Sequence, residues 1–152
     1  MTMQGVKHLF VDTNILIYAT NSASPWHQAA MDALQAARRQ GVELVVSPQI
    51  LREYLAAATR PCSAGETLPL DAILANVRAF QANFRLVEEN ALVSARLVDL
   101  VSQVAVGGKQ IHDANIVATM QTYGLTHLLT RNTADFVRFA HLITLVSLPV
   151  AV

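Results

Sequence analysis

Apolar residues follow two spacings along the chain, short continuous runs and longer stretches with helical periodicity. The short runs predict five buried strands, at 7–11, 44–46, 84–87, 127–130 and 143–146. Helical spacing, caps and stop signals predict the helices between them, at 12–18, 24–40, 47–59, 69–82, 88–106, 111–123 and a short one from 132. Strands that alternate with helices indicate an α/β domain whose parallel sheet is covered on both faces.

Local signals mark several of the predicted helix starts. A serine followed by a proline, at 24–25 and again at 47–48, is typical of a cap residue with proline in the first turn. Asp12 or Thr13 can cap the first helix. The stretch 60–83 carries turn residues and then a helical pattern, and we interpret it as a variable segment of the same domain.

Composition narrows the class of protein. The 152 residues fit a single domain, 1–152. Charged residues make up 14% of the chain, against about 25% in typical proteins, so apolar surface can remain for a partner. The formal net charge is zero, which argues against coating long nucleic acids but permits a local RNA contact. The single cysteine, Cys62, cannot form a disulfide within the chain and fits a reducing cytoplasm. No apolar run approaches the ~18 residues that a membrane-spanning helix needs.

Only eleven acidic residues are present, so each can be weighed by its position. Asp12 closes the first predicted strand, at the edge of the sheet where α/β proteins bind ligands. Asp113 shares a helix face with Ile116, Val117 and Met120, so it points along an apolar stripe, where a lone carboxylate is costly. Glu53 and Asp135 are the two other candidates. The other seven acids have ordinary structural explanations, because they lie on predicted surfaces, in a loop, before a strand or at helix starts. They are Asp32, Glu43, Glu66, Asp71, Glu88, Glu89 and Asp99.

Each of the four candidates also has a purely structural explanation. Asp12 can be a helix cap, and Asp113 can be held by backbone amides at its helix start. Glu53 lies at the border of its apolar stripe, where a charge at the rim is common. Asp135 follows Asn132 by three residues, which resembles a capping box, yet it also comes just after the fourth predicted strand.

The four candidates can converge at the carboxyl edge of the sheet. Two carboxylates ~5 Å apart repel each other by ~3 kcal/mol at an effective dielectric constant of about 20, so four together require a cation. Oxygen ligands favour Mg²⁺ or Mn²⁺ over zinc. Such an ion can lower the pKa of a bound water and stabilise charge that builds up on a phosphate.

Four segments resemble the acidic motifs of the PIN domain family, in the family's order. They are Val-Asp-Thr-Asn-Ile-Leu at 11–16, Ser-Pro-Gln-Ile-Leu-Arg-Glu at 47–53, Ile-His-Asp-Ala at 111–114 and Thr-Arg-Asn-Thr-Ala-Asp-Phe at 130–136. Together they span nearly the whole chain. Within this family the chain is most similar to the VapC-type toxins of prokaryotic toxin–antitoxin pairs.

This resemblance implies a three-layer α/β/α fold with a parallel sheet of about five strands in the order 3-2-1-4-5. It also implies a metal-dependent endoribonuclease that forms a homodimer and is inhibited by a small antitoxin protein. The family's catalytic, metal-binding acids correspond here to Asp12, Glu53, Asp113 and Asp135.

The resemblance also implies residues that support these acids. Asn14 would orient Asp12, and Thr130 and Asn132 would support the fourth position. Many relatives have aspartate where this chain has Asn132. Either Asn132 or Asp135 therefore completes the metal site, directly or through water.

The resulting hypothesis is hydrolysis of an RNA phosphodiester with Mg²⁺ or Mn²⁺. Asp12 and Asp113 would hold the first ion, while Glu53 and Asp135 complete the acidic ring and orient the attacking water. Arg131 is a candidate phosphate contact, with a solvated arginine as the alternative.

Three alternatives compete with this hypothesis. The chain can be a catalytically weak binding module that acts through RNA or an antitoxin. It can be a phosphatase with Asp12 as nucleophile, although Asn14 stands where such enzymes place a second acid. His112 can be a catalytic base by residue type, but neighbouring helical residues face different ways, so we assign it a structural role.

Overall fold

A five-stranded parallel sheet forms the centre of the computed structural model, which describes residues 3–61 and 68–149. Every hydrogen-bonded pair of strands is parallel, and the strand order is β3-β2-β1-β4-β5. The predicted α/β class and the predicted order 3-2-1-4-5 are confirmed. The strands are β1 (His8–Val11), β2 (Glu43–Val46), β3 (Arg85–Leu86), β4 (His127–Leu129) and β5 (Thr144–Val146).

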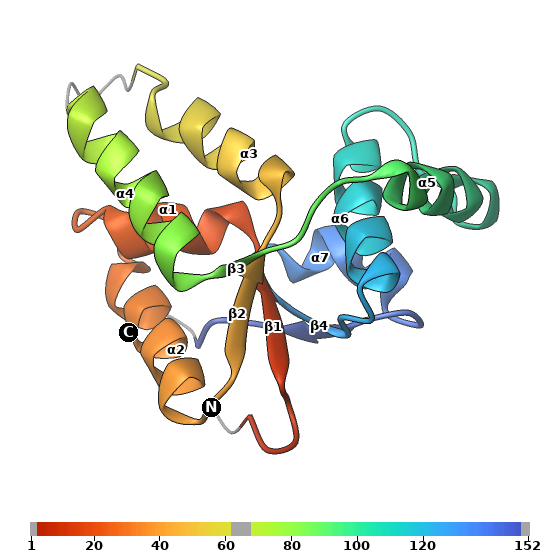
Figure 1. Ribbon diagram of the computed structural model, residues 1–152, viewed down its shortest axis with the longest axis horizontal. Helices are drawn as coiled ribbons and strands as arrows, with labels where there is room; N and C mark the ends of the chain where they lie inside the picture. Colours follow the sequence, from red (N-terminus) through yellow and green to blue (C-terminus); the bar gives the residue numbers. More distant parts are fainter. Residues whose placement is uncertain (1–2, 62–67, 150–152) are drawn as a thin grey trace.

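Helices cover the sheet from two sides. In Figure 1, α1 to α4 lie on one side of β1 and β2, and α5 to α7 lie on the other. No helix of the described residues has the length and apolar content needed to cross a bilayer. The helices are α1 (Thr13–Thr20), α2 (His27–Arg39), α3 (Pro48–Ala58), α4 (Leu70–Asn83), α5 (Ala91–Gln103), α6 (Gln110–Thr122) and α7 (Thr133–Phe136), followed by the 3₁₀ turn η1 (Val137–Phe139).

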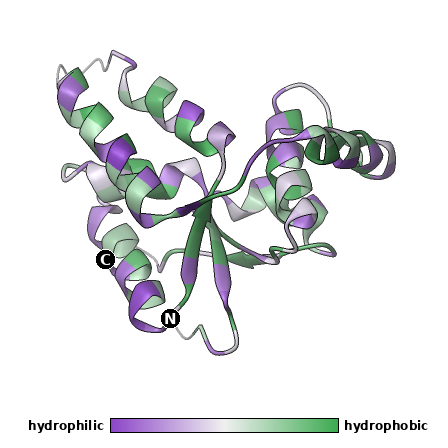
Figure 2. Ribbon diagram, viewed as in Figure 1, coloured by the Kyte–Doolittle hydropathy of each residue, from purple (hydrophilic) through white to green (hydrophobic). Residues whose placement is uncertain are grey.

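The two central strands are buried on both faces. Leu9, Phe10 and Val11 of β1 and Val45 and Val46 of β2 have no exposed surface, and Figure 2 shows the carboxyl halves of both strands as apolar. Burial on both faces explains why these strands are continuous apolar runs in the sequence and do not alternate with polar residues.

The edge strand β3 is shorter than the predicted run 84–87. Only Arg85 and Leu86 pair with β2, and both are exposed, whereas the flanking Phe84 and Val87 are buried. β3 is an edge strand, with β2 as its one neighbour in the sheet.

Two helices begin later than the sequence predicts. The Oγ of Ser24 accepts a hydrogen bond from the backbone of Trp26, so the serine–proline pair forms a turn before α2 begins. Asn90 caps α5 by accepting from the backbone N–H groups of Leu92 and Val93, so α5 spans Ala91–Gln103 and not 88–106.

The helix α6 is buried around most of its circumference. It packs against both α5 and α7. Residues Ile116 to Met120 are consecutive and all buried, so the predicted apolar stripe is not a stripe. The cost of placing Asp113 near this core therefore depends on what surrounds its carboxylate.

The predicted variable segment 60–83 is described only in part. Its second half is α4, and residues 62–67, which include Cys62 and Glu66, lie outside the described part of the chain.

Candidate active site

Two neighbouring strand ends place Asp12 and Thr130 side by side. Val11 is in register with Leu129, and the backbone N–H of Asp12 donates to the carbonyl of Leu129 at 3.0 Å. Asp12 is 7% exposed and Thr130 is fully buried, and the Thr130 hydroxyl donates to Asp12 Oδ2 at 2.7 Å. The parallel register of β1 and β4 thus fixes one oxygen of the Asp12 carboxylate.

Asp12 is both a helix cap and a member of the site. Its Oδ1 accepts from the backbone N–H of Thr13 at 2.7 Å, which caps α1. The amide of Asn14 donates to Asp12 Oδ2 and to Thr130 Oγ1, both at 3.3 Å, and Asn14 Oδ1 accepts from the backbone of Arg131. Asn14 is therefore in position to orient Asp12.

All four candidate acids line one open cavity of about 310 Å³. Asp12 comes from the end of β1, Glu53 from α3, Asp113 from α6 and Asp135 from α7. The remaining lining residues are Thr13, Asn14, Ile17, Tyr18, Ala57, Asn132 and Phe136.

Both oxygens of Glu53 are held by hydrogen bonds that the sequence did not predict. Thr13 Oγ1 donates to Glu53 Oε2 at 2.7 Å, and Gln49 Nε2 donates to Glu53 Oε1 at 2.8 Å. Gln49 precedes Glu53 by four residues on α3, the spacing at which helical side chains meet, and this was the available sequence signal. Glu53 is thus more than a solvated rim charge, because two side chains fix its orientation.

Gln49 also ties α3 to α6. This side chain is 3% exposed, and its amide donates to the backbone carbonyl of His112 at 2.9 Å. Its Oε1 accepts from Asn115 Nδ2 at 2.7 Å. Every polar atom of the buried Gln49 side chain therefore has a partner, as burial requires.

Glu89 completes this network at the start of α3. Its Oε1 accepts from the backbone N–H of Gln49 at 2.6 Å, and its Oε2 lies 3.4 Å from Asn115 Nδ2. The predicted cap Ser47 makes no side-chain hydrogen bond to the helix, and its buried Oγ has no partner among the described residues. Ser47 is the N-cap residue of α3, as the sequence predicts, but the carboxylate of Glu89 and not the Ser47 hydroxyl accepts from the helix backbone.

The predicted capping box at α7 does not form. Asn132 makes no side-chain cap hydrogen bond, although its carbonyl accepts from the backbone N–H of Asp135 at 3.1 Å. The Asp135 side chain is exposed and faces the acidic cavity. Asn132 lines the same cavity, and its backbone N–H donates to Thr130 Oγ1 at 3.1 Å.

The four carboxylates affect one another electrostatically. The pKa of Asp12 is raised from 3.8 to about 6: burial is the largest cause, the hydrogen bonds from Thr130 and Thr13 oppose the rise, and the charges of Glu53 and Asp135 contribute to it. Burial is thus the dominant influence on Asp12.

Asp113 responds to the same charges. The pKa of Asp113 is raised from 3.8 to about 6, chiefly by burial and then by repulsion from Asp135, Asp12 and Glu53, while the nearby Arg138 opposes the rise. Three carboxylates thus act on Asp113 against one arginine, so the cavity favours a positive ligand.

Oxygen donors dominate the cavity, which suits a hard divalent cation. Four carboxylates and two side-chain amides line it, with no cysteine or histidine among the lining residues. Within 3–61 and 68–149, no three Asp, Glu, His or Cys side chains stand together as a ready-made metal site. The donor set is of the kind that suits Mg²⁺ or Mn²⁺, and Mg²⁺ commonly keeps several waters and binds through one or two protein carboxylates.

Two other predicted candidates lie outside the cavity lining. The guanidinium carbon of Arg131 lies 4.1 Å from the centroid of the Trp26 ring, a cation–π geometry. His112 is exposed and contributes its backbone carbonyl to Gln49. The side chain of His112 does not line the acidic cavity, and its structural role stays a prediction.

Comparisons with known proteins agree with this architecture. The PIN domain family model matches residues 9–142. No curated protein is significantly similar to the chain in sequence.

Solved structures resemble the chain over most of its length. VapBC2 from Rickettsia felis, bound to a DNA fragment of its promoter, has 17% identity and a TM-score of 0.68, with coverage of 93% of this chain and 99% of that one. A toxin–antitoxin complex from Klebsiella pneumoniae has 25% identity and a TM-score of 0.63, covering 90% and 96%. VapC20 from Mycobacterium tuberculosis, a toxin that cleaves the sarcin–ricin loop, has 18% identity and a TM-score of 0.60, covering 79% and 86%.

Proposed function

The chain belongs to the PIN domain family, and from this premise we propose that it is an endoribonuclease dependent on Mg²⁺ or Mn²⁺. The observation that carries the proposal is the convergence of four carboxylates from four elements on one cavity. Burial and mutual repulsion raise the pKa of Asp12 and Asp113, and a bound cation would relieve that repulsion.

Each of the four acids that line the cavity has a role in the proposed hydrolysis. Asp12 and Asp113 hold the cation, and Glu53 and Asp135 accept hydrogen bonds from the attacking water and orient it toward the phosphate. The cation supplies positive charge that stabilises the phosphate and lowers the pKa of water. Either Asn132 or Asp135 completes the set of oxygen donors, since both line the cavity.

We further propose that the chain is the toxin of a VapBC-type pair. Support comes from its structural neighbours, which include toxin–antitoxin complexes from two organisms. In this proposal a small antitoxin protein binds the chain and inhibits it. The chain forms a homodimer in the cytoplasm, and its substrate there is RNA. The low share of charged residues, 14%, is consistent with apolar surface reserved for such partners.

Single-turnover cleavage of RNA tests the proposed function. We expect cleavage with Mg²⁺ or Mn²⁺ and none with a chelator. Asp113→Asn should lower the rate by about 10² or more, the scale on which losing one electrostatic contribution to catalysis is measured. The matched control is Asp99→Asn, the same change at an exposed position of α5. Wild-type activity in Asp113→Asn would refute the scheme.

A catalytically weak binding module is the competing function. It predicts that the wild type binds RNA or an antitoxin but cleaves no RNA, and that Mn²⁺ titration detects no binding. The set of four carboxylates on one cavity argues against it, because carboxylates that bind no cation would repel one another at a cost to stability.

A further inference from the structure

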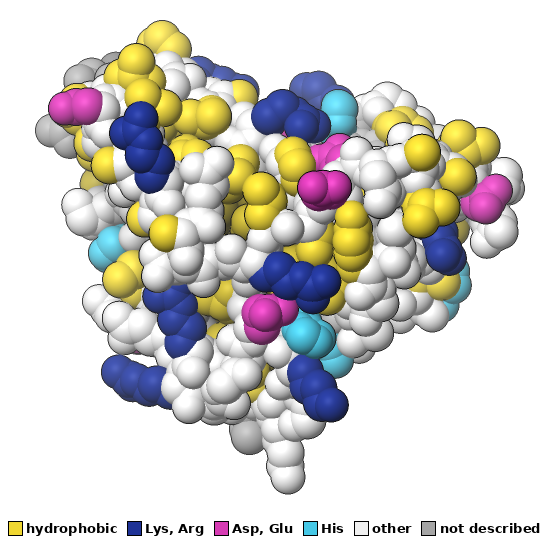
Figure 3. All heavy atoms as spheres, viewed as in Figure 1, with side chains coloured by type: hydrophobic (Ala, Val, Ile, Leu, Met, Phe, Trp, Pro, Cys, Tyr) yellow, Lys and Arg dark blue, Asp and Glu magenta, His cyan; other side chains and the backbone are white. Residues whose placement is uncertain are grey.

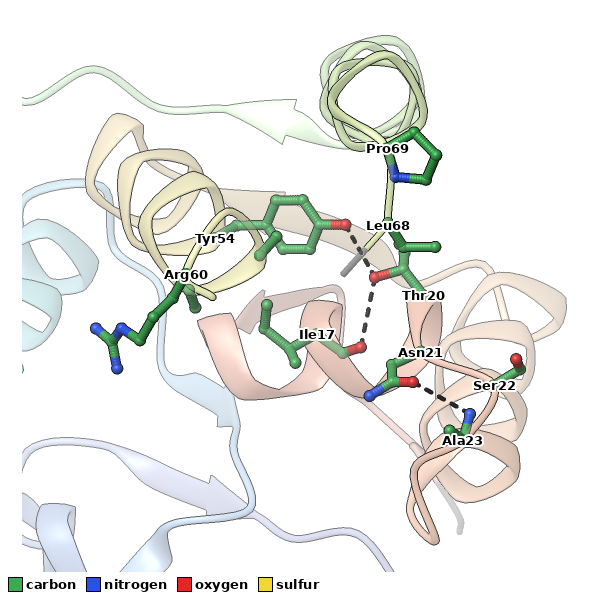
Figure 4. Close-up of a pocket in the computed structure, with 11 residues that line it drawn as sticks. Ile17, Thr20, Asn21, Ser22, Ala23, Tyr54, Arg60, Leu68 and Pro69 are labelled. Atoms are coloured by element: carbon green, nitrogen blue, oxygen red, sulfur yellow. Dashed lines mark hydrogen bonds between the residues drawn. The ribbon is translucent and has the colours of Figure 1, made fainter. Parts of the chain in front are cut away.

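A second cavity, of about 430 Å³, adjoins the candidate active site. Its lining comes from the end of α1 and the turn that follows, the end of α3, and the residues leading into α4 (Figure 4). Ile17 and Ala57 line both this cavity and the acidic one. The two hollows are therefore adjacent parts of one groove between α1 and α3, and a ligand longer than one cavity can occupy both.

The chemistry of the second cavity differs from that of the first. No aspartate or glutamate is among its lining residues. Tyr54 is fully buried beneath it, and Leu68 is 43% exposed at its margin. Apolar lining residues suit the flat, uncharged face of an aromatic group. They are Ile17, Ala23, Tyr54, Ala57, Ala58, Leu68 and Pro69.

Polar side chains around the cavity include both an acceptor and a donor. Thr20 Oγ1 donates to the carbonyl of Leu16 at 2.9 Å and contacts the Tyr54 hydroxyl at 2.9 Å (Figure 4 shows the second contact). With its proton used, the Thr20 hydroxyl can only accept from a ligand. Asn21 Oδ1 accepts from the backbone of Ala23 at 3.1 Å, so its Nδ2 remains a donor.

One cation borders the cavity. Arg60 follows the end of α3 and is exposed, and in Figure 4 its guanidinium points away from Thr20 and Tyr54. It forms no ion pair with a carboxylate of the described residues. A free guanidinium beside a neutral cavity suits a ligand whose flat group is attached to an anion such as a phosphate.

We propose that this cavity binds the base of a nucleotide next to the cleaved phosphate, and that Arg60 contacts the RNA backbone there. The inference rests on the proposed ribonuclease function. An RNA strand with its reacting phosphate at the acids continues past Ile17 and Ala57 into the second cavity. An unpaired base supplies the flat face and the donor and acceptor edges that the lining requires. The second cavity then sets which nucleotide is accepted beside the cut.

Filling the cavity tests base recognition. We expect the wild type to discriminate among the four bases at one position beside the cut in short single-stranded RNAs. Ala58→Leu fills the cavity and should reduce that discrimination at least about fivefold, since one ill-fitting group in a pocket changes selectivity by this order. Ala56→Leu, an exposed residue of the same helix that lines neither cavity, should keep the wild-type pattern. Equal patterns in both variants, or no preference in the wild type, would overturn the proposal.

The Arg60 contact is tested separately, without cleavage. Binding of a single-stranded RNA is measured in chelator across a salt series. Arg60→Gln should make the slope of log K against log salt shallower by about 0.7, the value for one lost phosphate contact. Arg78→Gln on the exposed face of α4 should leave the slope unchanged. An unchanged slope in Arg60→Gln contradicts the proposal even if Ala58→Leu fails to fold.

These experiments distinguish failure of the proposed ribonuclease function from failure of the proposed base-binding cavity. Absence of cleavage by the wild type with Mg²⁺ and Mn²⁺ refutes the ribonuclease function. Cleavage with unchanged base preference in Ala58→Leu refutes only the base-binding cavity. If Ala58→Leu loses antitoxin binding but keeps the wild-type base preference, the cavity binds the antitoxin, and the proposal that it binds a base is refuted.

Discussion

At the scale of single residues, Asp12 shows how one carboxylate can cap a helix and still serve a charged site. The hydrogen bonds from Thr13 and Thr130 favour the ionised form, but burial outweighs them and raises the pKa of Asp12 to about 6. Asp12 thus caps α1 and also lines the acidic cavity, so the cap does not exclude the role in the site that the sequence predicts. The carboxylate is held ionised at neutral pH against a cost that a bound cation would reduce.

This cost makes stability depend on pH in the metal-free protein. A carboxylate whose pKa is raised in the folded state binds more protons when folded than when unfolded between pH 3.8 and about 6, so stability falls as pH rises through that window. A rise from 3.8 to about 6 corresponds to ~3 kcal/mol.

We therefore expect Asp12→Asn to gain stability relative to the wild type as pH rises. The gain should reach about 2 to 3 kcal/mol between pH 4 and pH 7, because asparagine carries no charge. Urea unfolding in chelator at both pH values measures this difference, and Asp32→Asn on the exposed side of α2 is the control. A wild-type and Asp12→Asn difference that does not change with pH would show that burial of this charge has no cost.

At the scale of elements, a polar network joins α3, α6 and the segment before α5. Gln49 is its centre, because it contacts Glu53, Asn115 and the carbonyl of His112. Helices that frame a site gain a fixed relative position from buried polar contacts, provided that every group is satisfied. The one acid of α6, Asp113, is two residues before Asn115, so the same network positions α3 and α6 around the cavity.

Removal of the Gln49 amide should therefore loosen the site as well as the fold. Gln49→Leu leaves Asn115 and the carbonyl of His112 without this partner, and we expect a loss of about 2 kcal/mol or more in stability. Because Glu53 also loses a donor, Mn²⁺ affinity should fall on the order of tenfold, as for residues that orient metal ligands.

Denaturant unfolding and Mn²⁺ titration at a temperature where the variant is folded measure the two effects. Gln103→Leu, an exposed change at the end of α5, is the control. Unchanged Mn²⁺ affinity in a destabilised Gln49→Leu would restrict Gln49 to a structural role.

At the scale of the whole molecule, charge and apolar surface set how partners are bound. Eleven basic and eleven acidic residues give no net charge, and Figure 3 shows basic side chains scattered over the visible face. Apolar side chains remain on the surface of α5, where Leu92 and Val98 are 67% and 69% exposed. Such a surface favours recognition through a few local contacts over long-range attraction.

RNA affinity should accordingly depend weakly on salt. With two or three phosphate contacts on single-stranded RNA, we expect a slope of log K against log salt near −2 or shallower. Fluorescence anisotropy measures this slope when the salt concentration is varied between about 50 and 200 mM. A slope steeper than about −4 would indicate a basic surface that the chain does not display.

The sequence alone determined the features that depend on residues close together along the chain. Strands buried on both faces are apolar runs whatever surrounds them, so the elements and the position of Asp12 at a strand end were predictable. The position of Asp113 on a helix face with apolar residues also singled it out, whereas the strand order and most of the support for Glu53 came from the family motifs. The structure places all four acids on one cavity.

Only the tertiary structure decided the features that depend on distant partners. Glu89 serves the start of α3 where Ser47 was expected, and Gln49 meets Asn115 across 66 positions of sequence. The second cavity likewise exists only where α1, α3 and the start of α4 meet. Hydrogen-bond partners and cavities are set by packing between elements, which the periodicity of a single segment does not encode.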